Sequence, residues 1–134
     1  MHQVIRLNPP LLPDSTKAGY SQITVVEPGR MAYISGQVAW RITGEPAPAD
    51  LVEQTEIVVG NAKAALDALG AKPEDIVVVR VFMTDLNPTT LQRVFPVLHM
   101  WFAGAQPCVT GVGVTSLAAP DLQIEMELTV RIPD

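Results

Sequence analysis

Glu125 and Glu127 are two carboxylates that lie two positions apart in the segment IEMELTV, residues 124–130. The residues that alternate with them are apolar, which predicts a β-strand with one face on a core and an acidic opposite face. A carboxylate on such a face can accept a hydrogen bond from a water molecule or a ligand, as a general base does. The alternative is a solvated or interface-facing strand. We take Glu125 as a candidate catalytic residue and favour the structural alternative for Glu127.

Arg80 is the one charged side chain in an apolar stretch, residues 76–83. A buried charge without a partner costs several kcal/mol, so Arg80 must find a carboxylate or carbonyl groups. Glu125 and Glu127 are candidates if their strand lies beside that of Arg80. We favour this ion pair over the alternative that Arg80 is a cation for a ligand.

Thr110 is followed by Gly111 and precedes Gly113 by three residues. This segment could present backbone N–H groups to an anionic ligand, or its glycines could let another subunit approach closely. The sequence leaves both interpretations open. Cys108, at the start of the same segment, is interpreted as a small core residue.

The elements that must position these residues follow from periodicity and turn residues. Strands are predicted at residues 4–7, 23–26, 31–38 and 75–86, and Pro28–Gly29 predicts a hairpin between the second and third. Gly36 predicts a bulge or a close backbone approach. The last third of the chain, residues 108–131, predicts two strands paired with each other through a short connection.

Two helices are predicted between the strands. The first runs from Leu51 to Leu69, with Asp50 as N-cap and Gly70 as the stop. The second starts after Asn87 and ends near Gly104, with a kink expected at its internal proline. This order predicts one α+β domain over residues 1–134, a mixed sheet with both helices on one face. The other face is left open for a dimer or trimer interface.

Composition narrows the possible functions. Apolar residues make up 48% of the 134, charged residues 17%, and the net charge is −5, which indicates a folded chain and argues against nucleic-acid binding. No apolar run is long enough to cross a membrane, and we expect a cytoplasmic protein. One cysteine with His2 and His99 is too few ligands for structural zinc, so we expect no metal.

Four segments in order resemble the YjgF/RidA family. They are GYSQ at 19–22, ISGQ at 34–37, QTEIVVGNAKAALDALGA at 54–71 with DIVVVRVFMTDL at 75–86, and GVGVTSLAAPDLQIEMEL at 111–128. The resemblance implies a chorismate-mutase-like fold and a homotrimer with small-molecule clefts between subunits. It also implies cofactor-free hydrolysis of enamines and imines to keto acids.

The resemblance further implies that Tyr20, Ser35 and Glu125 line the cleft. In the deaminating members an arginine binds the substrate carboxylate, and counting back from Leu117 and Glu125 puts Val109 in its place. An arginine binds a carboxylate with two hydrogen bonds, and a valine cannot. We therefore expect either a deaminase with an altered substrate, such as one held by Arg80 or one without a carboxylate, or a non-catalytic metabolite-binding trimer. A ribonuclease or translation inhibitor, as some relatives have been called, is disfavoured by the acidic charge.

Overall fold

The computed structural model describes residues 3–134 and has eight main elements. The strands are β1 (Val4–Leu7), β2 (Ile23–Val26), β3 (Met31–Gln37), β4 (Ile76–Met83), β5 (Cys108–Gly113) and β6 (Ile124–Arg131). The helices are α1 (Leu51–Leu69) and α2 (Pro88–Phe102), and short 3₁₀ turns lie at Thr16–Ala18 and Pro73–Asp75.

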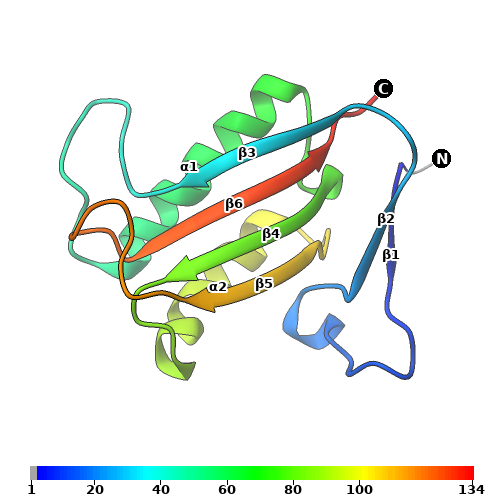
Figure 1. The fold of residues 1–134 in the computed structure, drawn as a ribbon, viewed down its shortest axis with the longest axis horizontal. Coiled ribbons are helices and arrows are strands. Elements are labelled where there is room, and N and C mark those ends of the chain that lie inside the picture. The colour runs from blue at the N-terminus through cyan, green and yellow to red at the C-terminus, as the bar shows by residue number, and fades with distance from the viewer. Residues whose placement is uncertain (1–2) are drawn as a thin grey trace.

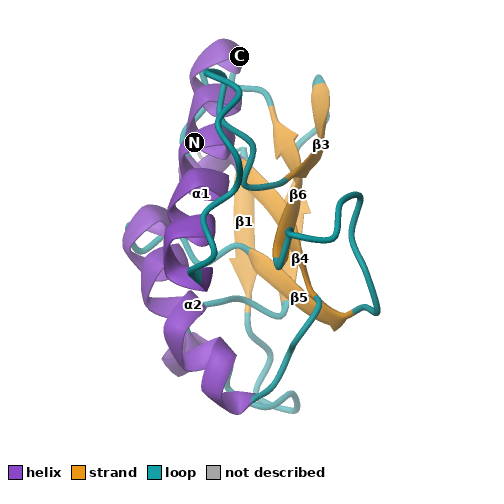
Figure 2. Cartoon of the chain, turned by 90° about the vertical axis from the view of Figure 1, so that its left-hand side faces the viewer, coloured by secondary structure: helices purple, strands orange, loops and turns teal. Residues whose placement is uncertain are grey.

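The main sheet has four strands in the order β3-β6-β4-β5. The β3–β6 and β4–β6 pairs are antiparallel, and β4–β5 is parallel because α2 carries the chain back between them. Both helices cover the same face of this sheet, and the other face is open (Figures 1 and 2). The predicted α+β architecture, a mixed sheet with two helices on one face, is confirmed.

Both helices begin at the predicted caps. The Asp50 carboxylate accepts from the Glu53 N–H at 3.0 Å, and Gly70 ends α1 in the left-handed conformation. Asn87 caps α2 through the Thr90 N–H at 3.0 Å, with Pro88 in the first turn. Pro96 lies inside α2 without ending it.

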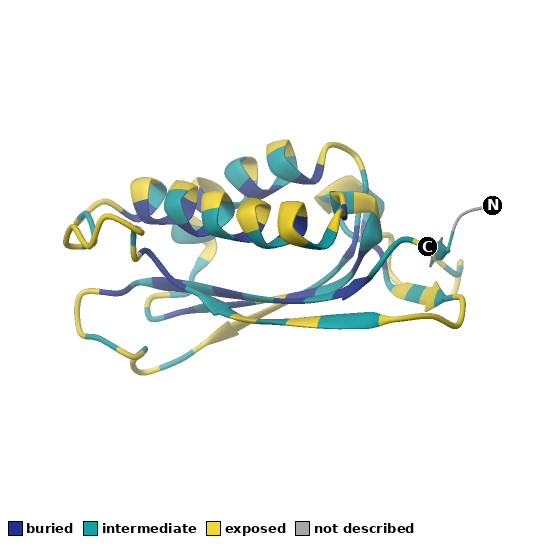
Figure 3. Ribbon diagram, turned by 90° about the horizontal axis from the view of Figure 1, so that it is seen from above, coloured by how far each residue is buried: buried dark blue, intermediate teal, exposed yellow. Residues whose placement is uncertain are grey.

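The core lies between the helices and the covered face of the sheet (Figure 3). Val79, Val81 and Met83 of β4 point into it, as do the apolar residues that alternate with Glu125 and Glu127. The acidic alternation in β6 therefore has the predicted orientation. A smaller apolar cluster of Val38, Ala39 and Leu122 joins the loops after β3 and before β6.

The predicted β2–β3 hairpin is wrong. β2 pairs with β1 in a separate two-stranded sheet, whereas β3 pairs with β6. The guanidinium group of Arg131, whose side chain is buried, lies at the turn and donates to the carbonyls of Glu27 and Pro28 at 3.0 and 2.7 Å. It packs so closely on Gly29 that no Cβ would fit there. The carbonyls at this turn thus bind Arg131, and the chain passes from the small β1–β2 sheet to the main sheet instead of forming a hairpin.

The predicted pairing of the two closing strands is also wrong, because β4 lies between them (Figure 1). The β4–α2–β5 crossover places β5 on one side of β4, and β6 occupies the other side. A strand that is apolar along most of its length is more stable at an inner position of a sheet than at its edge.

Neither α1 nor α2 is long and apolar enough to cross a membrane, and they are the long helices within residues 3–134.

Candidate functional site

The open face of the main sheet carries three rows of side chains that cross neighbouring strands. The first row is Tyr33, Thr129, Val78 and Cys108. The middle row is Glu127, Arg80 and Thr110, with Ser35 beside them on β3. The third row is Glu125, Phe82 and Val112. Residues paired across a sheet share a face. The middle row is thus a line of hydrogen-bonding groups across the sheet.

Arg80 and Glu127 form an ion pair on this face. Arg80 Nη1 donates to Glu127 Oε1 at 3.1 Å, and the two side chains are 48% and 42% exposed. The predicted partnership of Arg80 with a glutamate of the neighbouring strand is confirmed. At this exposure the pair contributes little to stability, so the fold does not require it.

Glu125 lies at one end of the open face, against the backbone of Gly36. The β3–β6 register shifts between Ile34 and Gln37, which leaves Ser35 and Gly36 in a bulge. An ideal Cβ at position 36 would be 2.5 Å from Glu125 Cδ and Oε2. Both predicted features of Gly36, the bulge and the close approach, are confirmed, and together they place the Glu125 carboxylate against the backbone of the bulge that also contains Ser35.

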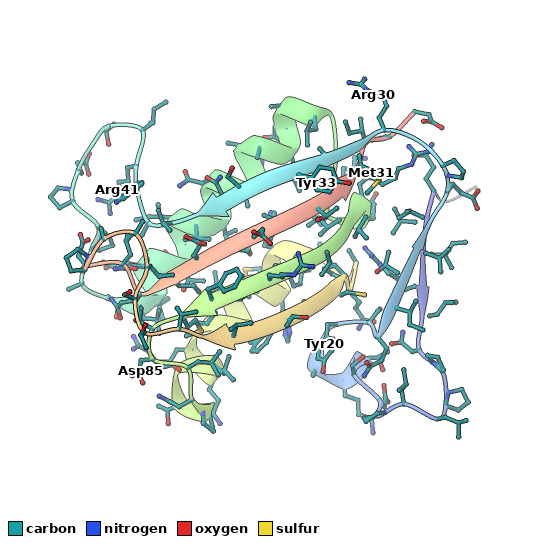
Figure 4. All side chains as sticks on the ribbon, viewed as in Figure 1. Tyr20, Arg30, Met31, Tyr33, Arg41 and Asp85 are labelled. Atoms are coloured by element: carbon teal, nitrogen blue, oxygen red, sulfur yellow. The ribbon has the colours of Figure 1, made fainter. Side chains whose placement is uncertain are left out.

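Tyr20 lies beyond the other end of the sheet, next to the start of β5 (Figure 4). The following residue, Ser21, donates its N–H to the Pro107 carbonyl at 3.2 Å, and Ser15 Oγ donates to the Tyr20 carbonyl at 2.8 Å. Gln106 Nε2 donates to the Thr16 carbonyl at 3.1 Å. The segment that carries Tyr20 is thus attached to the turn between α2 and β5.

The small sheet is attached to the same region. Arg6 of β1 donates to the Ala105 carbonyl at 3.2 Å and to Thr24 Oγ1 at 2.9 Å, and Thr24 Oγ1 lies 3.1 Å from Cys108 Sγ. Burial lowers the pKa of the Arg6 guanidinium, and the nearby Cys108 and Asp75 partly oppose this shift. Arg6 stays charged because its ordinary pKa is far above neutral.

Val109 faces away from the middle row. It pairs with Val79 and packs against the core on the helix side, whereas Arg80 and Thr110 pair with each other on the open side. Arg80 therefore cannot replace a cation at position 109, since the sheet separates the two side chains. Sequence counting alone left this alternative open.

Gly111 and Gly113 follow Val109 on the helix side, where Leu86 lies 3.5–3.6 Å from the ideal Cβ positions. The Val114 N–H points to β4, since it donates to the Met83 carbonyl. By alternation the N–H groups of Gly111 and Gly113 point outward, along the edge that β5 presents. The Thr110 N–H points toward β4, and the outward backbone donors of β5 at this edge are those of Val109, Gly111 and Gly113.

Tyr20 and Glu125 of one chain are too far apart to line one cleft. The row of Cys108 and the row of Glu125 are four residue steps apart along β4, from Val78 to Phe82, which is about 13 Å. The width of two strand spacings adds about 10 Å across the sheet. The structure thus brings together Ser35, Arg80, Thr110 and Glu125 on one face, and leaves Tyr20 and Val109 elsewhere.

Tyr33 and Thr129 were not singled out from the sequence, although they border the middle row. With Ser35, Arg80 and Glu127 they line a depression of about 390 Å³. Strand alternation alone places Tyr33 on the same face as Ser35, so the sequence could have predicted Tyr33 as part of this face.

No group of three or more His, Cys, Asp or Glu side chains lies close enough to hold a metal in the described part of the chain, which does not include His2.

Comparison with known proteins gives consistent matches. The model of the family described as Endoribonuclease L-PSP matches residues 13–132. The chain is 33% identical over 121 residues to the RutC family protein YjgH of Escherichia coli, covering 90% of this chain and 89% of YjgH. It is 30% identical over 114 residues to a 2-iminobutanoate/2-iminopropanoate deaminase of Dermatophagoides farinae, covering 84% and 85%.

Among solved structures, a Rid-family protein of unknown function, YyfB from Yersinia pestis, superposes with a TM-score of 0.91. The superposition covers 97% of this chain and 99% of YyfB, at 33% identity. The family match spans most of the chain, and the structural neighbours have the chorismate-mutase-like fold. The chain therefore belongs to the YjgF/RidA family.

Proposed function

We propose that this chain forms a homotrimer that hydrolyses a small enamine or imine, without a cofactor, in clefts between neighbouring copies. The observation that carries the proposal is the position of Glu125, a carboxylate held against the backbone of the bulge that Ser35 and Gly36 form. The similarity to an iminobutanoate/iminopropanoate deaminase supports this class of reaction. A carboxylate held in one position can accept a hydrogen bond from a water molecule and orient it.

The separation of Tyr20 from Glu125 supports a cleft made by two copies. If the Tyr20 end of one sheet meets the Glu125 end of the next, Tyr20 comes to line the same cleft as Glu125 and Ser35. The outward N–H groups of Gly111 and Gly113 lie on the same edge as Val109 and would face the neighbouring copy.

The proposed reaction adds water across a C=N bond. The water oxygen bonds to the imine carbon while Glu125 accepts one water proton and passes it to the imine nitrogen, which gives a carbinolamine. Glu125 then accepts the hydroxyl proton and delivers it to the amine nitrogen, the C–N bond breaks and ammonia leaves. The carbon keeps the oxygen as a carbonyl, so one imine and one water yield one ketone and one ammonia.

Val109 defines the expected substrate preference. A valine cannot bind a carboxylate, and Arg80 lies on the opposite face of the sheet. The loss of one charge-assisted, two-point contact costs roughly 1.5–3 kcal/mol, or about ten- to a hundredfold in efficiency. The proposed substrate therefore has no carboxylate at this point of the cleft.

A ribonuclease is disfavoured because the charge of Arg80 on the open face is already paired with Glu127 rather than free for a phosphate group.

The test compares two classes of imine. An amino-acid oxidase supplies imino acids and an amine oxidase supplies imines without a carboxylate, with the loss of imine followed by semicarbazide trapping. We expect acceleration of the neutral imines, little acceleration of the imino acids, and loss of activity in Glu125→Gln. Val109→Arg is expected to raise imino-acid turnover by about ten- to a hundredfold.

The result that overturns the proposal is equally defined. If neither wild-type protein nor Val109→Arg accelerates either class of imine over buffer, the chain is not a deaminase of this kind. A non-catalytic metabolite-binding trimer would then be the better function. Light scattering tests the assembly separately, since a monomer of 14.4 kDa would exclude clefts between copies.

A further inference from the structure

A groove of about 530 Å³ runs between α1 and α2. Both helices lie on the side of the sheet opposite the open face (Figure 3). None of the residues of the proposed hydrolytic clefts lines this groove. Its lining residues, from both helices, are Glu56, Val59, Pro96, Val97, Met100 and Trp101.

The floor of the groove is apolar and rests on the core. Val59 and Trp101 are partly buried and pack against the core cluster, which holds them in place. Met100 is 85% exposed, so a ligand that covers it removes apolar surface from water. Sites for small organic molecules are clefts of about 300–1,000 Å³ with mostly apolar walls and a few polar groups. The groove matches this description in size and in lining.

Glu56 is the charged residue of the groove, and it takes part in no ion pair within residues 3–134. The positions three and four residues before and after it hold valine, glutamate, valine and glycine, so no base lies one helical turn away. The lysine and the arginine of these helices have other partners. Lys63 pairs with Asp67 at 2.8 Å, and Arg93 pairs with Asp50 at 2.7 Å. The groove therefore carries an uncompensated negative charge.

Pro96 provides a second hydrogen-bond acceptor on the facing helix. A proline has no N–H, so the carbonyl of Gln92, four residues earlier in α2, lacks its usual helical donor. Helix carbonyls point along the axis toward the C-terminal end, and this one points toward Pro96, which lines the groove. Both polar features of the groove, one from each helix, are thus acceptors.

We propose that this groove binds a small primary ammonium ion that carries an aromatic or branched apolar group. The apolar group covers Val59, Met100 and Trp101, and the ammonium group donates to the Glu56 carboxylate and the Gln92 carbonyl. An ammonium group has only donors, which matches a site that offers only acceptors. An indole ring also attracts cations more strongly than other aromatic side chains do. The net charge of −5 favours the approach of cations.

The same groove disfavours the related ligand classes. An apolar anion would meet the unpaired charge of Glu56. An apolar alcohol would gain the apolar contacts alone. A cation without an apolar group would gain little, because pairing with an exposed carboxylate contributes little by itself. The proposed ligand class gains from both parts of the groove.

This site does not depend on the proposed imine hydrolysis. The open face and the helices lie on opposite sides of the sheet (Figure 2), and Glu125 and Tyr20 do not line the groove. The experiment therefore measures binding of a stable ligand rather than turnover. Failure of one proposal leaves the other intact.

The test is an NMR titration of the full-length, ¹⁵N-labelled protein with 2-phenylethylammonium. The chain has two tryptophans, and Trp40→Phe assigns their indole signals. The Nε1–H signal of Trp101 is expected to shift in a saturable way. Trp40 is 52% exposed and does not line the groove, so its signal is expected to stay in place as an internal control.

Three further probes separate charge from apolar contact. 2-Phenylethanol has the same ring without the charge, and 3-phenylpropanoate has the opposite charge. Each is expected to bind about tenfold more weakly than 2-phenylethylammonium, or weaker still. Methylammonium, which has the charge alone, is expected to produce no saturable shift of the Trp101 signal.

Variants locate the two parts of the site. Glu56→Gln is expected to weaken binding of the ammonium ion about threefold or more and to leave binding of 2-phenylethanol unchanged. Glu53→Gln is the matched control, because it removes the same charge from an exposed position of the same helix outside the groove. The control is expected to bind nearly as wild type does. Met100→Ala is expected to weaken both ligands about threefold or more, since the apolar contact is common to them.

Four outcomes would each overturn the proposal. The first is the absence of a saturable Trp101 shift with 2-phenylethylammonium. The second is equally tight binding of 2-phenylethanol or 3-phenylpropanoate. The third is an equal loss of binding in Glu53→Gln and Glu56→Gln. The fourth is a Trp101 signal that moves with protein concentration in the absence of ligand, which would show that a second copy of the chain occupies the groove.

Discussion

The carboxyl group of Glu125 occupies the space in which a side chain at position 36 would begin. An ideal Cβ on Gly36 would lie 2.5 Å from Glu125 Cδ and Oε2, closer than any real Cβ contact. The bulge at Ser35 and Gly36 brings the backbone to this point by interrupting the β3–β6 register. The glycine and the bulge therefore fix where the carboxylate of the proposed site lies.

Gly36→Ala is expected to move Glu125 without unfolding the chain. The nearest atoms are the far end of a flexible side chain, so the glutamate can rotate away from the new methyl group. Loss of a positioned general base lowers turnover by about 10²-fold or more. Steady-state kinetics on a neutral imine and the urea midpoint together check this, and a variant with full activity would contradict it.

Gly60→Ala is the matched glycine control and a prediction in its own right. Gly60 lies within α1, and an added Cβ meets nothing within 4 Å. Glycine inside a helix is about 0.5–1 kcal/mol less favourable than alanine. We expect unchanged turnover and a free energy of unfolding raised by that amount, measured by urea denaturation.

Gly19→Ala is expected to release the segment that carries Tyr20. Gly19 has φ of +86°, and an added Cβ would collide with the imidazole ring of His99. Gly44 has a similar φ of +81° with nothing within 4 Å, so Gly44→Ala carries the backbone strain without the collision. We expect Gly19→Ala to lower the free energy of unfolding more than Gly44→Ala and to raise amide hydrogen exchange at Ser21. Equal effects of the two variants would show that His99 does not hold this segment.

Arg131→Met is expected to destabilise the join between the two sheets. The Arg131 side chain is buried and donates to the carbonyls of Glu27 and Pro28 and, at 3.1 Å, to Asp134 Oδ1. Methionine leaves these carbonyls without a donor, at a cost of about 1–3 kcal/mol for each group that stays buried. Urea unfolding measures the loss, with the half-exposed Arg93→Gln as a control expected to change stability by less than about 1 kcal/mol.

The stability of the start of α1 is expected to depend on acid pH through Asp50. The hydrogen bond from the Glu53 N–H, and then that from Arg93, hold the pKa of the Asp50 carboxyl below its usual value. The folded chain thus binds this proton less tightly than the unfolded chain. The stabilisation is complete above the usual pKa and is lost as pH falls through the lower, folded-state value.

The measurement is the difference in urea midpoint between wild type and Asp50→Asn at a series of pH values. Wild type is expected to be the more stable near neutral pH, and the difference is expected to shrink toward zero in acid. Asp14, whose pKa is lowered by its hydrogen bonds with Thr16, is present in both proteins and cancels. A difference that does not vary with pH would contradict the assignment to Asp50.

The local features of the fold could be predicted from the sequence. The caps Asp50 and Asn87, the stop at Gly70, the bulge at Gly36 and the alternation around Glu125 all lie where the residues predict them. Each depends on neighbours within a few positions, so the chain itself contains the information. The pairing of Arg80 with a glutamate was also predicted, although the reason given for it, burial of the Arg80 charge, is wrong in the chain described, where the side chain is 48% exposed.

Strand partners were decided by the tertiary structure. The residues at Pro28–Gly29 and in the last third predicted two local pairings, and neither forms. The buried Arg131 binds the carbonyls at the first turn, and β4 separates the two closing strands. The Arg131 contacts join residues about a hundred positions apart and the β4 pairings join residues 30 to 54 positions apart, so no local pattern records them.

The candidate site was likewise predicted in part from the sequence and decided in part by the tertiary structure. The residues themselves pointed to Arg80, Thr110 and Glu125 as able to do chemistry, and the family resemblance added Ser35 and the expectation that Val109 takes the place of the arginine of the deaminating members. Only the tertiary structure decided that Val109 and Arg80 lie on opposite faces, and that Tyr20 and Glu125 lie at opposite ends. Alternation fixes which residues of one strand share a face, whereas the relation between strands depends on how the whole sheet assembles.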